Sequence, residues 1–379
     1  MAERIVLFTG SDRDFEEYLD KDINPGDETV EFLELIRKYN AHVRASDLIT
    51  EDFELDAKNE VDNCIVRATD FGSVLAHVIS NFASIVTQAY DLKNLYVQNP
   101  PTRVRKSLES FFPGMIEEAG SEYREITKDA IKTVYDEMAE RVLGQKDCKR
   151  EIALSLYRLH SIDNSRPVVI MFYGPSGVGK TESAKCLSEA LGGGLTRIQI
   201  SMMQTTEAYE YIFGAEHSKG SFARDLLCRE SNVVLLDEFD KVNASLYNAF
   251  YQLFDEGEYV DTNYDVDMRN GIFILTSNFS SEAEIKRELG AAMFSRIGAC
   301  VAFDDLPLNA KKEIARRHYS SLCAKLENED RLEIETTDIE EWFQENAGRF
   351  DNMRIMKTKI ERAIFGHLTD KLLELSKES

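Results

Sequence analysis

A single glycine-rich run constrains the fold of this 379-residue chain more than any other feature. Residues Gly174–Thr181 read GPSGVGKT and fit the pattern GxxxxGK[ST]. The run follows the short apolar stretch 168–173, which is typical of a buried parallel strand, and it precedes 182–191, which has the composition of a helix. A strand, a glycine-rich loop and a helix in this order predict a loop that wraps around phosphate groups with its backbone N–H groups pointing inward.

Each part of this loop has an expected task. Lys180 can reach the outer phosphates of a nucleotide, and the Thr181 hydroxyl can ligate Mg²⁺. The positive end of the following helix dipole adds to anion binding. We therefore predict that nucleotide is bound by Gly174, Pro175, Ser176, Gly177, Val178, Gly179, Lys180 and Thr181.

From residue 141 onward, apolar runs alternate with helical segments. The expected strands are 168–173, 197–200, 232–236, 271–276 and 299–303. This alternation predicts an α/β fold, in which a parallel sheet is flanked by helices. We place this P-loop subdomain at 139–308. The remaining stretch, 309–379, has no strand-like run, and we expect it to form a small helical lid.

The first hundred residues form a separate unit that we expect to be mixed α/β or mostly helical. It opens with a strand-like run at 4–10. Helices are expected over 28–39 and 73–98, the second ending at Asn99-Pro100-Pro101. Residues 101–138 are expected to be a charged helical connector to the P-loop subdomain.

Polar side chains follow two further apolar runs, at the points where parallel strands would end. Asp237 and Glu238 follow one run, and Asn278 follows another. Ligands of open α/β sheets bind at that edge. We assign Asp237, with Thr181, to Mg²⁺, Glu238 to the attacking water as a base, and Asn278 to the γ-phosphate or that water. The alternatives are local: acids that stabilise a helix N-terminus, and a helix cap at Asn278.

The charge of the chain disfavours nucleic-acid partners. It has 45 basic and 68 acidic residues, a net charge of −23. Such a chain is repelled by DNA, RNA and anionic membrane surfaces, whose own charge is negative. The densest basic run, 103–106, is expected to be a solvated linker. The acids between Asp12 and Glu34 are irregularly spaced and predict a solvated face instead of a metal site.

The cysteines and the N-terminal residues help to predict the cellular compartment of the protein. Six cysteines lie far apart without a CxxC pair, which favours reduced thiols over disulfides or zinc. Met1–Gly10 lacks the pattern of a signal peptide, and no apolar run approaches membrane-spanning length. We therefore expect a cytoplasmic protein with no membrane contact.

The order of these motifs resembles the AAA+ ATPases, and within them the Clp and heat-shock unfoldase branch, over residues 139–370. The segments that carry the resemblance are 141–145 (RVLGQ, similar to a VIGQ box), 174–181 (Walker A), 235–238 (LLDE, Walker B), 240–257 (similar to the run leading to LLQVLDDG) and 274–278 (ILTSN, the sensor-1 strand). The resemblance implies that Val142 and Leu143 contact adenine, and that Asn278 is the sensor.

The same resemblance implies functional roles for two arginines. The segment FSRI around Arg296 resembles F-x-x-R-I-D, with Gly298 in place of the aspartate, and this implies an arginine finger for the neighbouring subunit's γ-phosphate. Such a guanidinium neutralises charge in the transition state, so the site would be completed only in an oligomer. Arg354, in NMRIM, resembles the sensor-2 arginine that contacts nucleotide from the lid. The alternative for each arginine is a surface ion pair.

One motif of the branch is missing. Clp unfoldases grip substrate with the pore loop G-A-P-P-G-Y-V-G, whereas 214–221 reads GAEHSKGS and lacks the Tyr-Val-Gly centre. Tyr209, Tyr211 and Phe213 come before this segment and are expected to pack. The stretch from Asn278 to Met293 is too short for a peptidase-docking insertion. We therefore do not expect coupling to a Clp-type peptidase.

The resemblance as a whole implies an ATP-hydrolysing AAA+ ATPase with ATP and Mg²⁺ as cofactors. It is expected to act as a homo-oligomeric ring, a hexamer, that remodels a protein partner held through residues 1–138. The first alternative is an ATP-driven assembly or signalling switch without substrate threading. A nucleic-acid-dependent motor is the least favoured reading because of the charge.

Overall fold

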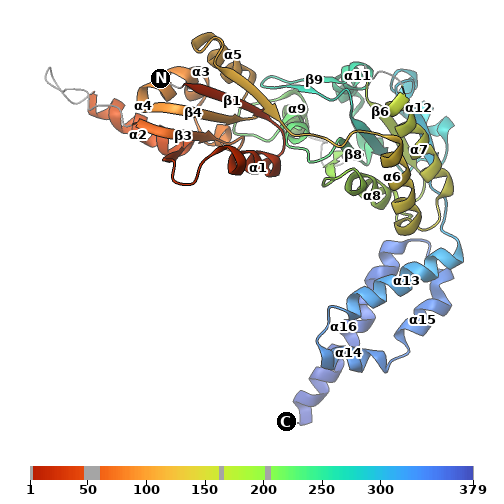
Figure 1. The fold of residues 1–379 in the computed structure, drawn as a ribbon. Helices are drawn as coiled ribbons and strands as arrows, with labels where there is room; N and C mark the ends of the chain where they lie inside the picture. Colours follow the sequence, from red (N-terminus) through yellow and green to blue (C-terminus); the bar gives the residue numbers. More distant parts are fainter. Residues whose placement is uncertain (1–2, 47–59, 162–165, 201–205, 379) are drawn as a thin grey trace.

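The computed structural model describes residues 3–46, 60–161, 166–200 and 206–378. Three bodies follow one another along the chain (Figure 1). We call them the front domain (residues 3–120), the P-loop domain (residues 126–303) and the lid (residues 306–378). Buried apolar side chains form separate clusters in each body, so each has a hydrophobic core of its own.

The front domain is built on a five-stranded sheet. Its strands are β1 (Arg4–Thr9), β2 (Thr29–Glu31), β3 (Glu60–Val66), β4 (Asp91–Gln98) and β5 (Ile116–Gly120). All of them pair in parallel, in the order β2-β3-β4-β1-β5. The helices are α1 (Asp12–Asp22), α2 (Phe32–Ser46), α3 (Ala76–Ser80), α4 (Phe82–Ala89) and α5 (Thr102–Phe111). The front domain is therefore α/β, the first of the two expected alternatives.

Three expectations for this region were wrong. The helix predicted over 28–39 begins only at Phe32, because 29–31 is strand β2. The single helix predicted over 73–98 is instead two short helices, α3 and α4, and 91–98 is strand β4 at the centre of the sheet. The predicted connector 101–138 is not helical throughout, because 116–120 is strand β5 and pairs with β1. Strand pairing overrides local preference at β4 and β5, since β4 is hydrogen-bonded on both sides and β5 on one.

The P-loop domain has a second five-stranded sheet. Its strands are β6 (Val168–Tyr173), β7 (Thr196–Gln199), β8 (Val233–Asp237), β11 (Ile272–Thr276) and β12 (Ala299–Ala302). They are all parallel, in the order β12-β6-β11-β8-β7, and each lies within one residue of its predicted range. A short antiparallel pair, β9 (Glu258–Val260) and β10 (Asp265–Asp267), lies outside this sheet.

The two sheets share one topology. When the strands of each sheet are numbered from one to five along the chain, both have the order 5-1-4-3-2. In both, the first strand therefore lies between the fourth and the fifth. The front domain thus repeats the strand arrangement of the P-loop domain.

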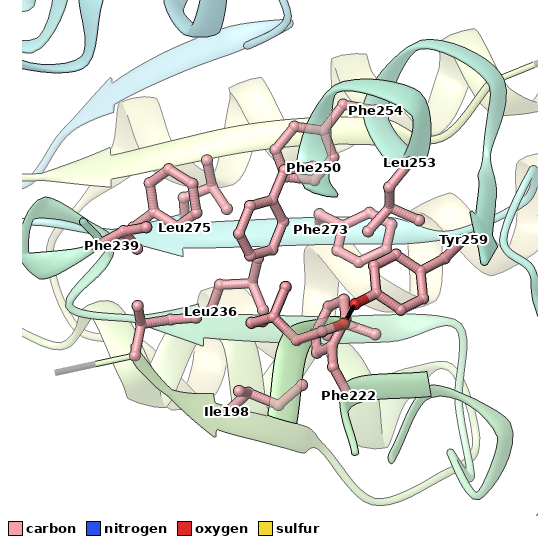
Figure 2. Close-up of a cluster of buried hydrophobic side chains, with 14 of the residues drawn as sticks. Ile198, Phe222, Leu236, Phe239, Phe250, Leu253, Phe254, Tyr259, Phe273 and Leu275 are labelled. Atoms are coloured by element: carbon pink, nitrogen blue, oxygen red, sulfur yellow. Dashed lines mark hydrogen bonds between the residues drawn. The ribbon is translucent and has the colours of Figure 1, made fainter. Parts of the chain in front are cut away.

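Helices cover both faces of the second sheet. They are α6 (Lys128–Arg141), α7 (Lys146–Ser161), α8 (Lys180–Ala190), α9 (Thr206–Phe213), α10 (Phe222–Leu227), α11 (Tyr247–Glu256) and α12 (Glu282–Phe294). Leu236 and Leu275 enter the core on one face, which is rich in aromatic rings (Figure 2), and their neighbours Leu235 and Ile274 enter the core on the other. Burial on both faces explains why these strands are continuous apolar runs.

The lid is helical, as predicted. It consists of α13 (Leu308–Cys323), α14 (Asn328–Glu335), α15 (Ile339–Asn346) and α16 (Met353–Glu378). Its core includes Met356, Ile360 and Ile364 from one face of α16. Among the described residues, no helix has both the length and the apolar character needed to cross a membrane.

Candidate functional site

The glycine-rich loop connects β6 to α8, as predicted. Gly174 is needed because its φ is 128° and a Cβ there would lie 2.2 Å from the carbonyl oxygen of Phe303. Gly179 has a φ of 107° and immediately precedes Lys180, the first residue of α8. The N-terminus of α8 therefore opens directly onto the loop, where its free N–H groups favour an anion.

Lys180 links the loop to the end of β11. Its side chain is 9% exposed, and its Nζ donates to the carbonyl oxygens of Gly174 and Pro175, the latter at 2.9 Å. The same Nζ lies 3.4 Å from Oδ1 of Asn278. Burial lowers the pKa of Lys180 to about 8, opposed by the nearby charges of Asp240 and Asp237. The structure thus brings together two predicted site residues that are 98 positions apart.

Asp237 and Glu238 lie at the same sheet edge, at the end of β8. Asp237 is 7% exposed, and its Oδ1 accepts a hydrogen bond from the Thr276 hydroxyl. Glu238 has a left-handed backbone with φ 57°, and its N–H donates to the oxygen of that hydroxyl at 2.9 Å. Thr276 therefore fixes both acids, the second in a backbone conformation that is rare for a residue with a side chain.

Arg197 is a site residue that sequence reasoning missed. It lies on β7, and its Nε donates to Oδ2 of Asp237 at 3.0 Å, with Nη2 on the same oxygen. The sequence offered little signal, because the contact depends on β7 pairing with β8 in register. To predict the contact between Arg197 and Asp237, one would have needed this strand register, which sets Gln199 opposite Asp237.

The donor atoms at this edge fit Mg²⁺. Thr181 and Asp237 supply hydroxyl and carboxylate oxygens, which are the ligands that this hard cation prefers. Two more buried oxygens here, Oδ1 of Asp240 and Oγ of Ser277, have no hydrogen-bond partner among the described residues. An unsatisfied carboxylate oxygen suits a hydrated cation, and an unsatisfied hydroxyl suits a cation or a phosphate oxygen. The described residues contain no cluster of three or more His, Cys, Asp or Glu side chains placed for a metal.

The predicted arginine finger lies in an ion pair within the chain. Nε of Arg296 donates to Oδ2 of Asp255 at 2.9 Å, and Nη1 donates to the Ala292 carbonyl oxygen at 2.7 Å. The guanidinium carbon also lies 4.3 Å from the centre of the Tyr251 ring. The surface ion pair that was the alternative for Arg296 is therefore present. A finger that acts on a neighbouring subunit would have to leave it.

The lid contacts the loop through Asn352. Nδ2 of Asn352 donates to the Ser176 hydroxyl at 3.1 Å, and the N–H of Met353 donates to the Gly177 carbonyl oxygen at 3.4 Å. A Cβ on Gly177 would lie 2.2 Å from Oδ1 of Asn352, so this glycine is needed for the contact. Arg354, the predicted sensor-2 residue, is the second residue of α16 and is exposed. Asn352 lies in the same NMRIM segment as Arg354, but the sequence predicted no role for it.

The segment predicted to contact adenine lies beside the loop and the lid. Val142 is 4% exposed in the core that also holds Val178 of the loop. Leu143 packs against the core of the lid. Nε2 of Gln145 donates to the carbonyl oxygens of Val178, at 3.4 Å, and Asp304, at 2.8 Å. The segment therefore joins the loop to the start of the lid.

The connection between β1 and α1, which is the equivalent place in the front domain, has no such loop, although the sheet has the same topology. Only Gly10 and Ser11 separate β1 from α1, whereas six residues, 174 to 179, separate β6 from α8. The corresponding space is filled by Asn99, whose Oδ1 accepts from the Gly10 N–H at 2.9 Å and whose Nδ2 donates to the Gly10 carbonyl oxygen at 2.8 Å. Gly10 itself has no room for a Cβ, which would lie 2.0 Å from Oγ of Ser121.

Comparisons with known proteins point to one family. Residues 165–333 match the model of the AAA domain (Cdc48 subfamily). The chaperone protein ClpB of Wolinella succinogenes is 29% identical over an alignment of 277 residues, which covers 65% of this chain and 32% of that protein. The ATP-binding subunit ClpC of the Clp protease of Staphylococcus aureus is 26% identical over an alignment of 283 residues, which covers 62% of this chain and 34% of that protein. The chain thus spans about a third of the length of these curated relatives.

Two solved structures share the fold. The ADP complex of Hsp104 from S. cerevisiae superposes with a TM-score of 0.53 at 16% identity, over 78% of this chain and 56% of the other. A closed state of Hsp104 with ATPγS and FITC-casein superposes with a TM-score of 0.55 at 15% identity, over 98% of this chain and 89% of the other. The second match includes the front domain, for which the sequence had suggested no relative.

Proposed function

The chain belongs to the Clp/Hsp100-like AAA+ ATPases, and from this premise we propose that it forms a ring that hydrolyses ATP to remodel a protein partner. The observation that carries the proposal is the convergence of Lys180, Asn278 and the Asp237-Glu238 pair on one sheet edge. A phosphate loop alone would support nucleotide binding only. A pair of adjacent acids, of which Asp237 is buried, and a polar amide at the same edge support hydrolysis.

The proposed roles follow from where each side chain lies. Lys180 and the N–H groups that begin α8 hold the phosphates, and Asn278, in contact with Lys180, lies where it can reach the γ-phosphate or the attacking water. Glu238 takes the proton of that water, with its backbone held by Thr276. Bound by Thr181 and Asp237, Mg²⁺ would neutralise charge on the phosphate oxygens.

We further propose that the site is completed between subunits. Arg296 would leave Asp255 and reach the γ-phosphate of a neighbouring subunit, where its charge stabilises the transition state. A closed ring in which every subunit donates one finger and receives one satisfies this requirement, and we propose a hexamer. Arg354 would contact nucleotide from the lid.

The experiment that tests hydrolysis is the Glu238→Gln substitution in the full chain. Glutamine is close in size but cannot accept the proton, so ATP binding should be retained while turnover falls by at least about a hundredfold. Binding is measured by equilibrium dialysis and turnover by phosphate release, with Glu282→Gln, an acid on α12 outside the proposed site, as the control. Normal turnover in Glu238→Gln would show that another group is the base.

A second candidate function is an ATP-driven switch that does not thread polypeptide. The observation that favours it is the absence of the aromatic pore motif from 214–221. The two candidates are distinguished by adding unfolded, carboxymethylated α-lactalbumin to the ATPase assay. Stimulation of turnover supports remodelling of polypeptide, and turnover that depends only on protein concentration supports the switch.

The partner is proposed to be a protein held by the front domain and the segment that follows it, residues 1–138. The net charge of −23 supports a protein partner over DNA or RNA. A cytoplasmic location stays a prediction from the sequence. Capture of binding proteins with Glu238→Gln in the presence of ATP tests the partner class, and DNA-stimulated turnover would contradict it.

A further inference from the structure

The segment 214–221, which we call the docking segment, takes the sequence position of a pore loop but is held at both of its ends. On one side, the Tyr259 hydroxyl donates to the carbonyl oxygen of Ile212 in α9. On the other, Phe222 begins α10 and packs edge-to-face on Tyr259, with ring centres 4.8 Å apart (Figure 2). Both ends are therefore fixed to the aromatic core of the P-loop domain.

A turn that follows β9 holds the start of the docking segment. The N–H and hydroxyl of Thr262 both donate to the Phe213 carbonyl oxygen, at 3.1 and 2.9 Å. Nδ2 of Asn263 donates to the carbonyl oxygen of Ala215 at 2.8 Å. Asn263 is 8% exposed, and its own carbonyl oxygen accepts from the N–H of Thr102 in the front domain at 2.8 Å. One buried residue, through its side chain on one side and its backbone carbonyl on the other, thus joins the docking segment to the front domain.

The front domain also contacts the middle and the end of the docking segment. A Cβ on Gly72 would lie 3.5 Å from the His217 carbonyl oxygen and 3.8 Å from Cα of Ser218. Arg224, on α10, donates through Nη2 to the carbonyl oxygen of Ala68 at 3.3 Å and through Nη1 to that of Lys219 at 3.5 Å. A single guanidinium therefore holds one backbone oxygen from each side.

Further contacts extend this interface along the turn after α10. Nδ2 of Asn99 lies 3.6 Å from Sγ of Cys228. Arg13 pairs with Glu230 at 3.3 Å, and the guanidinium carbon of Arg229 lies 4.5 Å from the centre of the ring of Tyr123, in the segment that links the two domains. Asn99 and Arg13 come from the same edge of the front sheet that holds nucleotide in the P-loop domain.

We infer that the docking segment is a fixed contact surface, or seat, on which the front domain packs, and that it does not grip polypeptide. The sheet edge that binds nucleotide in the P-loop domain has become, in the front domain, the surface that sits on the docking segment and α10. The two domains then move as one body through the ATP cycle. This inference rests on the proposed function, because it states which part of the ATPase stays still during turnover.

Disulfide formation between residues 72 and 218 tests the inference. Gly72→Cys and Ser218→Cys are combined in the full chain, because the distance from the Gly72 Cβ position to Ser218 Cα is within the reach of a disulfide. Gly72 has no positive φ, so a side chain is tolerated there. The rate of disulfide formation is measured without nucleotide, with ADP, and with ATP in the Glu238→Gln background. Each single cysteine variant is the control.

A fixed seat predicts rates that agree within about twofold in all three states, since the two residues stay adjacent. A rate that falls tenfold or more in any state, or the absence of the disulfide in the folded chain, would overturn the inference. Nucleotide binding is measured in the same samples. The readout does not require hydrolysis, so a chain that binds ATP without cleaving it would contradict the proposed function and leave this test valid.

A wedge at the same place gives an independent check. Gly72→Leu should separate the front domain from the docking segment and raise hydrogen exchange at 68–73 and 214–221, whereas Gly72→Ala makes only an ordinary contact with His217 and should leave exchange unchanged. Equal exchange in the leucine and alanine variants would contradict a closed seat.

Discussion

The side-chain amide of Asn352 in the lid donates a hydrogen bond to the hydroxyl of Ser176 in the phosphate-binding loop, at 3.1 Å. The lid therefore contacts the loop directly. Oδ1 of the same amide accepts from the N–H of Arg354 at 2.9 Å, so Asn352 also caps the start of α16. A bound nucleotide would compete with the first of these bonds and leave the second intact.

Asn352→Ser is expected to tighten ADP binding. Serine still caps a helix but is too short to reach Ser176, so only the bond to the loop is lost. A hydrogen bond of this kind contributes about 0.5–1.5 kcal/mol, and its removal from the nucleotide-free state should raise affinity about two- to tenfold. Isothermal titration measures the change. Weaker binding would show that Asn352 contacts the nucleotide, and Asn346→Ser, at the end of α15, is the control.

Arg197→Met is expected to lower the Mg²⁺ concentration that half-saturates ATP turnover. The guanidinium of Arg197 pairs with Asp237, the proposed Mg²⁺ ligand, so the cation has to displace it. Arg197→Lys retains a charge at this position and should shift the midpoint less. Titrations of turnover against Mg²⁺ compare the three proteins. A higher midpoint in the methionine variant would mean that Arg197 positions Asp237 for the cation.

The motifs of the P-loop domain could be placed from sequence because each stands at the end of a strand that is apolar throughout. Such runs are buried on both faces and have few alternatives, which is why the strands before Asp237 and Asn278 were predicted within one residue. Arg197 could not be found in this way. Its partner belongs to a neighbouring strand, and the order of strands in a sheet is a tertiary property.

The front domain was harder to predict for a related reason. The apolar spacing of α4 continues into 91–98, where Leu92, Leu95 and Tyr96 extend a helical pattern although the segment is strand β4. Strand β5 contains Glu117 and Glu118, which are exposed, and its pairing with β1 is what makes it a strand. In neither segment does the local sequence encode the conformation that the sheet imposes.

Acidification is expected to loosen the seat of the front domain through His217. Burial, with the charges of Arg103 and Arg224, lowers the pKa of His217 below its ordinary value, while Asp261 opposes them. Nδ1 of His217 is buried and has no partner among the described residues. The unfolded chain therefore binds a proton more readily than the folded chain. This contribution to stability is complete above the ordinary pKa of about 6.5 and is lost as the pH falls toward the lowered pKa.

Thermal melts between pH 7.5 and pH 5.5 measure this effect. The melting temperature of the wild-type chain should fall more than that of His217→Gln, which cannot titrate. The difference between the two proteins isolates His217 from the carboxylates and from other histidines, which titrate in both. Parallel curves would show that His217 is not desolvated in the folded chain.

The chain is expected to bind one nucleotide, although it contains two sheets of the same topology. Asn99 occupies the place of a phosphate loop in the front domain, and Gly10 has no free space beside it. Equilibrium dialysis with ADP should give one site per chain, and Lys180→Ala should remove it. A second site that survives in Lys180→Ala would place a nucleotide in the front domain.

Arg296 offers the sharpest test of a site shared between subunits. Its ion pair with Asp255 is compatible with a purely structural role, and both readings predict that Arg296→Ala alone loses activity or stability. The two readings differ only when subunits are mixed.

Mixing Lys180→Ala with Arg296→Ala is expected to restore ATP turnover that neither variant has alone. A subunit with alanine at 296 keeps its own nucleotide site and needs only a finger, which a neighbour with alanine at 180 supplies. If subunits mix randomly, about a quarter of the interfaces have an intact site on one side and an intact finger on the other. Phosphate release in a one-to-one mixture should therefore reach about a quarter of the wild-type rate. The chain that carries both substitutions is the control partner, and a mixture no more active than its parts would mean that Arg296 acts within its own subunit.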